Sequence, residues 1–133
     1  MALIVDTSVL IAAERATGSV AQVAPADSRL AVSAVTLIEL QRGVERAASA
    51  QRRRRREAFL REVQTLETLP VDATVALVGA RVWVDLERQG TPIPVFDLLI
   101  AATALAGERP LLTADVRHFS QVEGLELRVV KIG

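Results

Sequence analysis

The chain of 133 residues has no cysteine, no tyrosine, one tryptophan, one histidine and one lysine. The absence of cysteine excludes a disulfide scaffold, a thiolate zinc site and a cysteine nucleophile. The single histidine, His118, excludes metal sites that are built from several imidazoles. Aromatic residues make up only 3% of the chain, so the core must be aliphatic. Any chemistry therefore depends on carboxylates, hydroxyls and arginines.

Long hydrophobic runs are also missing. No stretch approaches the roughly 20 apolar residues that a membrane-spanning helix needs. The apolar start of the chain meets Asp6 too early to be a signal peptide. Half of the residues are nevertheless hydrophobic, which provides a full core for a chain of this length. The sequence therefore predicts a single domain over residues 1–133 that acts in the cytoplasm and has no membrane partner.

Short aliphatic segments alternate with helical patterns along the chain. We expect strands at residues 2–5, 30–33, 66–71, 110–113 and 127–132. We expect helices at residues 8–15, 34–48, 50–64, 73–89 and 97–106, and the start of another at 19–23. Asp72 fits the N-cap of the helix at 73–89, and Gly90 fits its end. This alternation favours an α/β fold, a three-layer α/β/α sandwich with a central parallel sheet.

Four of the sixteen acidic residues interrupt aliphatic segments. Asp6 and Asp115 follow predicted strands, whereas Glu39 and Asp97 lie within or at the start of predicted helices. An unpaired buried carboxylate is costly, so each of them needs a partner. Ligands of open parallel sheets bind beyond the carboxyl ends of the strands, which is where we expect these acids to gather. Such a cluster, with no lysine nearby in the sequence, suits a hard divalent cation.

A structural interpretation exists for each aspartate taken alone. Asp6, Asp97 and Asp115 could each cap a helix N-terminus, because aspartate is a favoured capping residue. Capping does not explain Glu39, which lies in the middle of a predicted helix. Gly43 lies one turn further on the same face, where a missing side chain leaves room beside the carboxylate. One shared function explains all four acids more simply than four separate causes.

Two hydroxyls accompany these acids. Ser8 and Thr113 each lie two residues from one of them, and could bond a carboxylate, a metal-bound water or a phosphate oxygen. Local turn or cap bonding is the alternative for either hydroxyl. We expect His118 to be a packing or capping residue.

Four short motifs follow one another in an order and spacing that resemble a known family. They are LIVDTS at residues 3–8, IELQRG at 38–43, DLLIAA at 97–102 and LTADVRHF at 112–119. Each motif is weak alone, but the four together cover essentially the whole chain. In this respect the chain resembles PIN-domain ribonucleases, and specifically the VapC-type toxins of bacterial and archaeal toxin–antitoxin pairs.

The resemblance implies a metal-dependent endoribonuclease, which hydrolyses RNA phosphodiester bonds with a metal-activated water. The family's catalytic acids match Asp6, Glu39, Asp97 and Asp115. The three aspartates would hold Mg²⁺ or Mn²⁺, and Glu39 would complete a second metal position or orient the attacking water. Ser8 and Thr113 match the family's supporting hydroxyls.

The resemblance also implies partners. These are an RNA substrate, a second copy of the chain in a homodimer, and a VapB-type antitoxin. Such antitoxins commonly lay a C-terminal segment over the acidic pocket and place a basic side chain in it. The alternative is a non-catalytic PIN-fold module that binds RNA or dimerises. The complete set of four acids favours the enzyme.

Arginine accounts for fifteen of the sixteen basic residues, and many of them lie in the two predicted helices around and after Glu39. Arginine-rich surfaces bind phosphate backbones without reading sequence. Arg42, Arg53 and Arg54 are therefore candidates for contact with RNA or with the antitoxin. A solvated helix face is the alternative interpretation of the charged run at residues 52–56.

Overall fold

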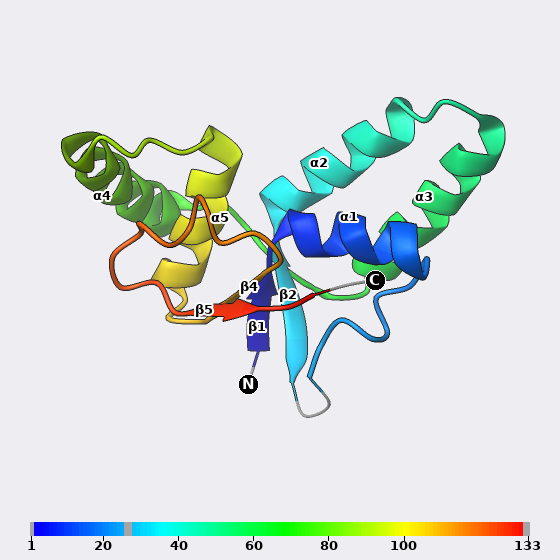
Figure 1. The fold of residues 1–133 in the computed structure, drawn as a ribbon, viewed down its shortest axis with the longest axis horizontal. Coiled ribbons are helices and arrows are strands. Elements are labelled where there is room, and N and C mark those ends of the chain that lie inside the picture. Colours follow the sequence, from blue (N-terminus) through cyan, green and yellow to red (C-terminus); the bar gives the residue numbers. More distant parts are fainter. Residues whose placement is uncertain (1, 26–27, 132–133) are drawn as a thin grey trace.

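The computed structural model describes residues 2–25 and 28–131. In chain order its elements are β1 (Ala2–Val5), α1 (Thr7–Ala16), β2 (Arg29–Ser33), α2 (Ala34–Glu45), α3 (Ala50–Val63), β3 (Glu67–Leu69), α4 (Ala73–Gln89), α5 (Val95–Ala106), β4 (Leu111–Thr113) and β5 (Leu127–Val129). The strands form one parallel sheet in the order β3-β2-β1-β4-β5 (Figure 1). Within the described residues no helix is both long and apolar enough to cross a membrane.

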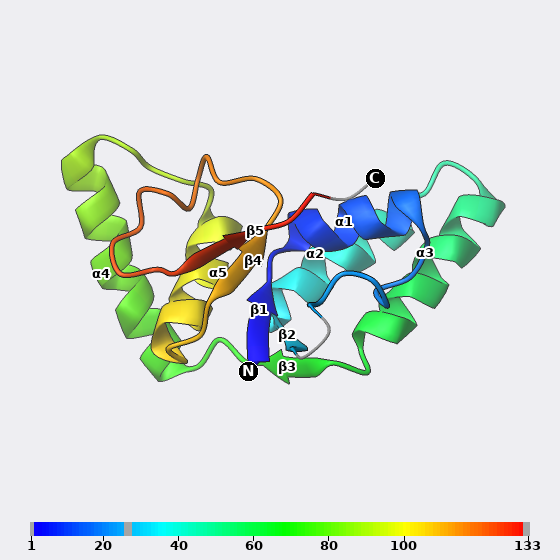
Figure 2. The same cartoon turned by 60° about the horizontal axis from the view of Figure 1, so that its bottom comes forward.

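Helices cover both faces of this sheet, because successive side chains of a strand point to opposite faces. Leu3 and Val5 of β1 belong to a core that includes α1, α3 and the second half of α2. Ile4, between them, belongs to a separate core with α4 and α5. Figure 2 shows these two helical groups on opposite sides of the strands. The structure thus confirms the predicted three-layer α/β/α sandwich with a parallel sheet.

The predicted and observed elements differ mainly at their ends. The strand expected at residues 66–71 is confined to β3, and the helix expected at 34–48 ends at Glu45. The helix expected from Asp97 begins two residues earlier, after Pro94, whose fixed φ suits a helix start. The strand expected at 127–132 ends at Val129, and residue 132 lies outside the described residues. The predicted ends of α4 are confirmed, because Asp72 accepts the Val75 N–H and Gly90 has a φ of 73°.

The prediction that a helix starts at residues 19–23 is wrong, since this segment forms turns and bends. The segment is short, and Pro25 soon follows without a backbone N–H to continue a helix. Its polar groups find tertiary partners instead. The Glu62 carboxylate accepts hydrogen bonds from the Ser19 hydroxyl and the Val20 N–H, both at 2.9 Å. These contacts satisfy the segment without helical bonding.

The strand order gives the sheet a switch point at its carboxyl edge, and the region beyond this edge, between β1 and β4, is called the crevice below. From β1 the chain continues to β2 and β3 on one side, whereas β4 and β5 lie on the other. The connections therefore diverge between β1 and β4, and open α/β sheets bind ligands at such a point. Helices α1, α2 and α5 all begin at this edge (Figure 1). The sequence segments that carry the four acids meet there.

Candidate active site

Asp6 stands at the end of β1 and is only 4% exposed. Its backbone N–H donates to the Leu112 carbonyl at 2.8 Å, which continues the pairing of β1 with β4. The Ser8 and Thr113 hydroxyls lie 2.6 Å and 3.0 Å from its Oδ2 atom. Although Asp6 occupies the N-cap position of α1, its side chain makes no capping bond. Capping therefore does not account for this buried carboxylate.

Glu39 lies on α2 and is half-buried. The Thr7 hydroxyl donates to its Oε1 atom at 2.7 Å, which joins the start of α1 to α2. Glu39 and Gly43 line a cavity of about 120 Å³ between α1, α2 and α3. A Cβ atom at Gly43 would meet nothing within 4 Å, so the absence of a side chain keeps this space open.

Asp97 lies in the first turn of α5, and Pro94 rather than Asp97 occupies the cap position. The Oδ2 atom of Asp97 is 2.6 Å from Nδ1 of His118, which comes from the turn after β4. Asp97 is the less exposed partner, with 22% of its side chain accessible against 42% for His118. His118 thus holds one carboxylate oxygen of a candidate site residue. We expected it only to pack or cap.

Asp115 is turned toward Arg117. The Arg117 Nη2 atom lies 2.7 Å from Oδ2 of Asp115, and Nε lies 3.1 Å from both carboxylate oxygens. The Arg117 backbone N–H adds a bond of 3.0 Å to Oδ1. This guanidinium and the backbone N–H lower the pKa of Asp115 to about 2. Asp115 is therefore an ionised carboxylate at the surface, and the charge of Arg117 balances its charge.

The other three acids influence one another. Burial raises the pKa of Asp6; the Ser8 and Thr113 hydroxyls oppose this, and the charge of Asp97 adds to it. Burial likewise raises the pKa of Glu39; the Thr7 hydroxyl opposes this, and the charges of Asp97 and Asp6 add to it. Among the described residues no arginine or lysine forms an ion pair with Asp6 or Glu39. Asp6 and Glu39 thus add negative charge at this edge of the sheet, and no ion pair with arginine or lysine among the described residues balances it.

This donor set has the chemistry that a hard divalent cation requires, namely several carboxylate oxygens in one crevice. As the side chains stand, however, no three candidate ligands among residues 2–25 and 28–131 converge on one point. Asp97 is held by His118 and Asp115 by Arg117. The residues fit a metal in kind and neighbourhood, and binding would require these two aspartates to adjust.

The structure thus brings together Asp6, Glu39, Asp97 and the two predicted hydroxyls, and leaves Asp115 at the rim. The sequence did not identify Thr7 and Arg117, which bond Glu39 and Asp115, or Thr36, which bonds Thr7. His118, expected to pack or cap, bonds Asp97. The signal for Arg117 was its spacing of two residues from Asp115. Thr7 and Thr36 showed no separate signal, since their partners lie far along the chain.

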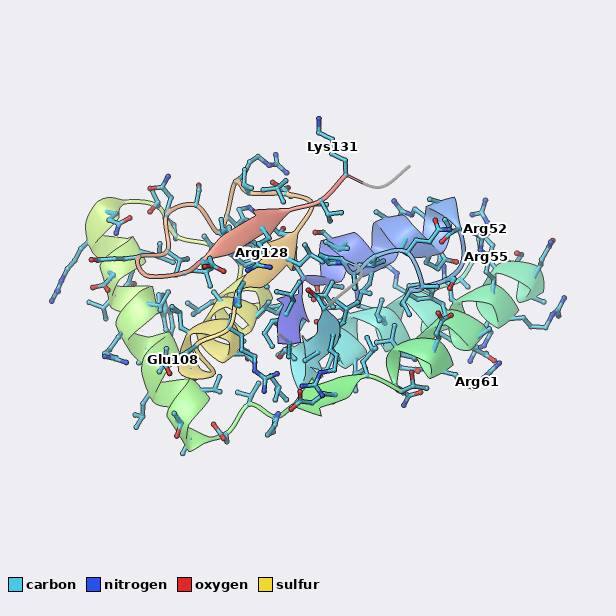
Figure 3. All side chains as sticks on the ribbon, turned by 90° about the horizontal axis from the view of Figure 1, so that it is seen from below. Arg52, Arg55, Arg61, Glu108, Arg128 and Lys131 are labelled. Atoms are coloured by element: carbon cyan, nitrogen blue, oxygen red, sulfur yellow. The ribbon has the colours of Figure 1, made fainter. Side chains whose placement is uncertain are left out.

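The candidate arginines are partly engaged within the protein. Arg53 pairs with Glu57 at 2.9 Å and with Glu45 at 3.5 Å. Arg42 is exposed on α2, where its charge lowers the pKa of Glu39. Arg54 has no hydrogen-bond or ion-pair partner among the described residues. Figure 3 shows other arginines of the same helix, among them Arg52 and Arg61, at the α3 side of the molecule.

A dependence of stability on pH follows from the two raised pKa values. Between the ordinary values of 3.8 and 4.5 and the higher folded values, the folded protein binds more protons than the unfolded chain. Stability should therefore fall as the pH rises through this window toward neutrality. Asp115 has the opposite effect, because its pKa is lowered to about 2. Its contribution to stability is lost as the pH falls from the ordinary pKa of 3.8 to the folded-state pKa of about 2.

The measurement is urea unfolding in EDTA from pH 4 to pH 7.5, with the Asp6→Asn, Glu39→Gln double variant as reference. We expect the wild type to lose stability relative to this variant as the pH rises. A difference that stays constant across the range would contradict the assigned shifts.

Comparison with known proteins assigns the chain to a family. The model of the PIN domain matches residues 3–125. Ribonuclease VapC5 of Mycobacterium tuberculosis is 40% identical over 121 residues, which cover 91% of this chain and 87% of that protein. Ribonuclease VapC1 of Rickettsia felis is 37% identical over 131 residues, covering 98% and 97%. The crystal structure of VapBC-5, a member of the VapBC toxin–antitoxin family from M. tuberculosis, has a TM-score of 0.80 and 33% identity, covering 98% of both chains.

The chain thus belongs to the PIN-domain family, whose model matches nearly all of it, and its fold agrees with this assignment. Within the family it belongs with the VapC ribonucleases, which it matches over nearly its full length.

Proposed function

We propose that this protein is a divalent-metal-dependent endoribonuclease that acts in the cytoplasm as the toxin of a type II toxin–antitoxin pair. One observation carries the proposal: three mutually repelling carboxylates, Asp6, Glu39 and Asp97, gather at the switch point of a VapC-type fold. Separating them by packing or pairing each with an arginine would have cost less free energy. The arrangement is therefore best explained by the ligand it binds.

Asp6, Asp97 and Asp115 would hold Mg²⁺ or Mn²⁺ once His118 releases Asp97 and Arg117 releases Asp115. Glu39 would complete a second metal position or orient the attacking water. A bound divalent cation supplies the positive charge that favours attack by water on an RNA phosphodiester and stabilises the charge that develops on the phosphate. Ser8 and Thr113 fix the Oδ2 atom of Asp6. In the hydrolysis, water adds to phosphorus, one P–O ester bond breaks, and the leaving oxygen gains a proton.

A VapB-type antitoxin is the proposed protein partner. The similar solved structures that support this are complexes, such as VapBC-5 from M. tuberculosis. The cavity beside Glu39 offers apolar walls from Ile11 and Phe59 next to a carboxylate. An antitoxin segment with an apolar and a basic side chain matches these two features. Arg42, Arg53 and Arg54 remain proposed contacts for RNA or antitoxin. Among the described residues, Arg53 pairs with Glu45 and Glu57, whereas the guanidinium groups of Arg42 and Arg54 form no hydrogen bond or ion pair.

A second copy of the chain is the other proposed partner, and we place it on the outer face of α4. Leu77 on that face is 71% exposed, and Val84, two turns further along the same face, is 42% exposed. Helix α4 lies on the opposite side of the sheet from the helices α1, α2 and α3 that line the cavity (Figure 2). Antitoxin and dimer contacts would then use different halves of the molecule.

A non-catalytic RNA-binding or dimerisation module is the second candidate. The observation that favours it is the absence of a convergent set of three ligands among the described residues. It differs from the enzyme in one testable respect, since such a module has no need of the negative charge of Asp97.

The test is controlled expression in a bacterium that lacks the antitoxin, followed by transcriptome-wide mapping of new RNA ends. The wild type is compared with Asp97→Asn and with Asp85→Asn, which makes the same chemical change at an exposed site on α4. We expect growth arrest and discrete new RNA ends with the wild type and Asp85→Asn, and neither with Asp97→Asn. Equal arrest by all three, or arrest without new ends, would favour the non-catalytic module.

A further inference from the structure

Two buried hydroxyls form a chain that ends on Glu39. Thr36 is fully buried and Thr7 is 3% exposed. Their Oγ1 atoms lie 2.9 Å apart, and the Thr7 Oγ1 lies 2.7 Å from Oε1 of Glu39. Thr7 directly follows Asp6 at the start of α1, and Thr36 lies one turn before Glu39 on α2. These hydroxyls therefore link the start of α1, next to Asp6, to the helix that carries Glu39.

The direction of these hydrogen bonds follows from the number of hydrogens. An ionised carboxylate only accepts, so the single hydrogen of Thr7 goes to Glu39. The Thr7 oxygen is then an acceptor, and Thr36 must be the donor. Thr36 therefore donates to Thr7, and Thr7 donates to Glu39. Removing the Thr36 hydroxyl should change the hydrogen bond between Thr7 and Glu39.

Thr36 differs from an ordinary threonine inside a helix. Such a hydroxyl usually bonds a carbonyl of the preceding turn, as Thr103 does with the Leu99 carbonyl at 2.7 Å. Among the described residues, the only hydrogen-bond partner of the Thr36 hydroxyl is Thr7. A buried hydroxyl that is not used by its own helix requires another reason to be there, because burying it without a partner costs free energy.

We propose that Thr36 is a positioning residue, which acts through Thr7 to fix the Glu39 carboxylate for RNA cleavage; this inference rests on the proposed ribonuclease function. Glutamate has three rotatable side-chain bonds, and Glu39 is only half-buried. Holding its Oε1 atom leaves Oε2 free to face the crevice. Catalytic groups need placement within about 0.5 Å, and the groups that orient them supply it.

A packing role for Thr36 makes the opposite prediction for two simple variants. Thr36→Val keeps the branched shape and removes the hydroxyl, whereas Thr36→Ser keeps the hydroxyl and removes a methyl group. If the hydroxyl matters, serine rescues function and valine does not. If only packing matters, valine is harmless and serine is the damaging change. Thr103→Val is the matched control, because it removes a buried helical hydroxyl that bonds only backbone.

The first measurement is the rate of RNA cleavage by the purified full chain in Mn²⁺, with kcat and KM determined separately. We expect Thr36→Val to lower kcat by about 10- to 100-fold with little change in KM, as for other groups that orient ligands. Thr36→Ser and Thr103→Val should stay near the wild-type rate. In a Glu39→Gln background, Thr36→Val should cause no further loss, since both changes act on one group.

The second measurement needs neither RNA nor metal. In urea unfolding with EDTA, Thr36→Val should destabilise the wild type more than it destabilises Glu39→Ala, while Thr103→Val should act equally in both backgrounds. Full activity of Thr36→Val, or equal destabilisation in both backgrounds, overturns the proposal. A wild type that cleaves no RNA refutes the proposed function instead, and the unfolding cycle still decides whether the hydroxyl chain couples to Glu39.

Discussion

Replacing Asp6 by asparagine is expected to abolish RNA cleavage and to raise the melting temperature of the metal-free protein. The loss of activity should exceed about 100-fold, because even residues that merely orient metal ligands contribute that much. Asparagine cannot supply the negative charge that a divalent cation requires. The measurement is cleavage of RNA by the purified variant in Mn²⁺.

The gain in stability has a separate cause. Asp6 is 4% exposed, and burial together with the charge of Asp97 raises its pKa. A neutral amide of the same size removes the buried charge, and its oxygen can still accept from Ser8 and Thr113. Active sites often sacrifice stability for such a charge. We expect the melting temperature to rise by a few degrees. In a protein of this size, about 1 kcal/mol in the free energy of unfolding corresponds to roughly 3–5 °C.

The thermal melts are run in EDTA and in excess Mn²⁺, with Asp85→Asn as control. Manganese should stabilise the wild type and Asp85→Asn, by about 2.7 kcal/mol at a hundredfold excess over Kd, but should not stabilise Asp6→Asn. If Asp6→Asn melts at a lower temperature in EDTA, the carboxylate has a structural role as acceptor of two hydroxyls. That result would remove Asp6 from the proposed metal site.

The parts of the fold that could be predicted depend on local signals. The continuous apolar residues of β1 and the cap residues Asp72 and Gly90 define their elements without help from the rest of the chain. Helix α5 begins two residues before the predicted start, directly after Pro94, whose fixed φ suits the position before a helix. The helix predicted to start at residues 19–23 does not form, for a different reason. Its polar groups bond Glu62, which lies more than forty residues away.

The candidate site shows the same division. Asp6 and Thr113 could be placed because each stands at or next to the end of a strand, and parallel strands end at one edge. The contact of His118 with Asp97 could not be predicted, since it depends on how the turn after β4 packs against α5. The two-residue spacing indicated that Arg117 could reach Asp115, but not that Asp115 would turn to it instead of the other acids. Acids were thus easier to find than the groups that hold them.

Replacing Leu77 by glutamate is expected to convert a dimer into monomers. One side of α4 packs on α5 through the buried residues Val75, Gly79, Val82 and Leu86. The opposite side is exposed yet also apolar, and consists of Ala73, Leu77, Ala80 and Val84. A helix that is apolar on opposite sides is typical of one covered on both. In the proposed homodimer, the second copy provides that cover.

The spacing of the exposed residues suits pairing of α4 with itself. Ala73, Leu77, Ala80 and Val84 are separated by four, three and four residues, which is the spacing of contact residues in helices that pack side by side. In an antiparallel pair with twofold symmetry, Leu77 would lie against Ala80 of the other copy. Val84 would likewise lie against Ala73. Each large side chain thus meets a small one, and the surface is complementary to itself.

The size of the effect follows from this symmetry, because every substitution occurs twice in the dimer. Losing the burial of two leucines at about 2 kcal/mol each weakens association by roughly 1,000-fold. Sedimentation equilibrium of the Asp97→Asn protein, which avoids toxicity, with and without Leu77→Glu measures it. Val129→Glu is the control, since Val129 is 60% exposed on β5. Dissociation by Val129→Glu alone would place the interface at the sheet edge instead.

A mixing experiment tests the pairing itself. Ala80→Lys alone should also give monomers, because lysine would press against the partner's Leu77. In a mixture of Leu77→Glu and Ala80→Lys chains, one contact becomes glutamate against lysine and the symmetric contact keeps leucine against alanine. A heterodimer should therefore form from two proteins that are each monomeric alone. If the mixture stays monomeric while the unsubstituted protein dimerises, the two copies do not meet through an antiparallel α4 pair, since only that geometry opposes positions 77 and 80.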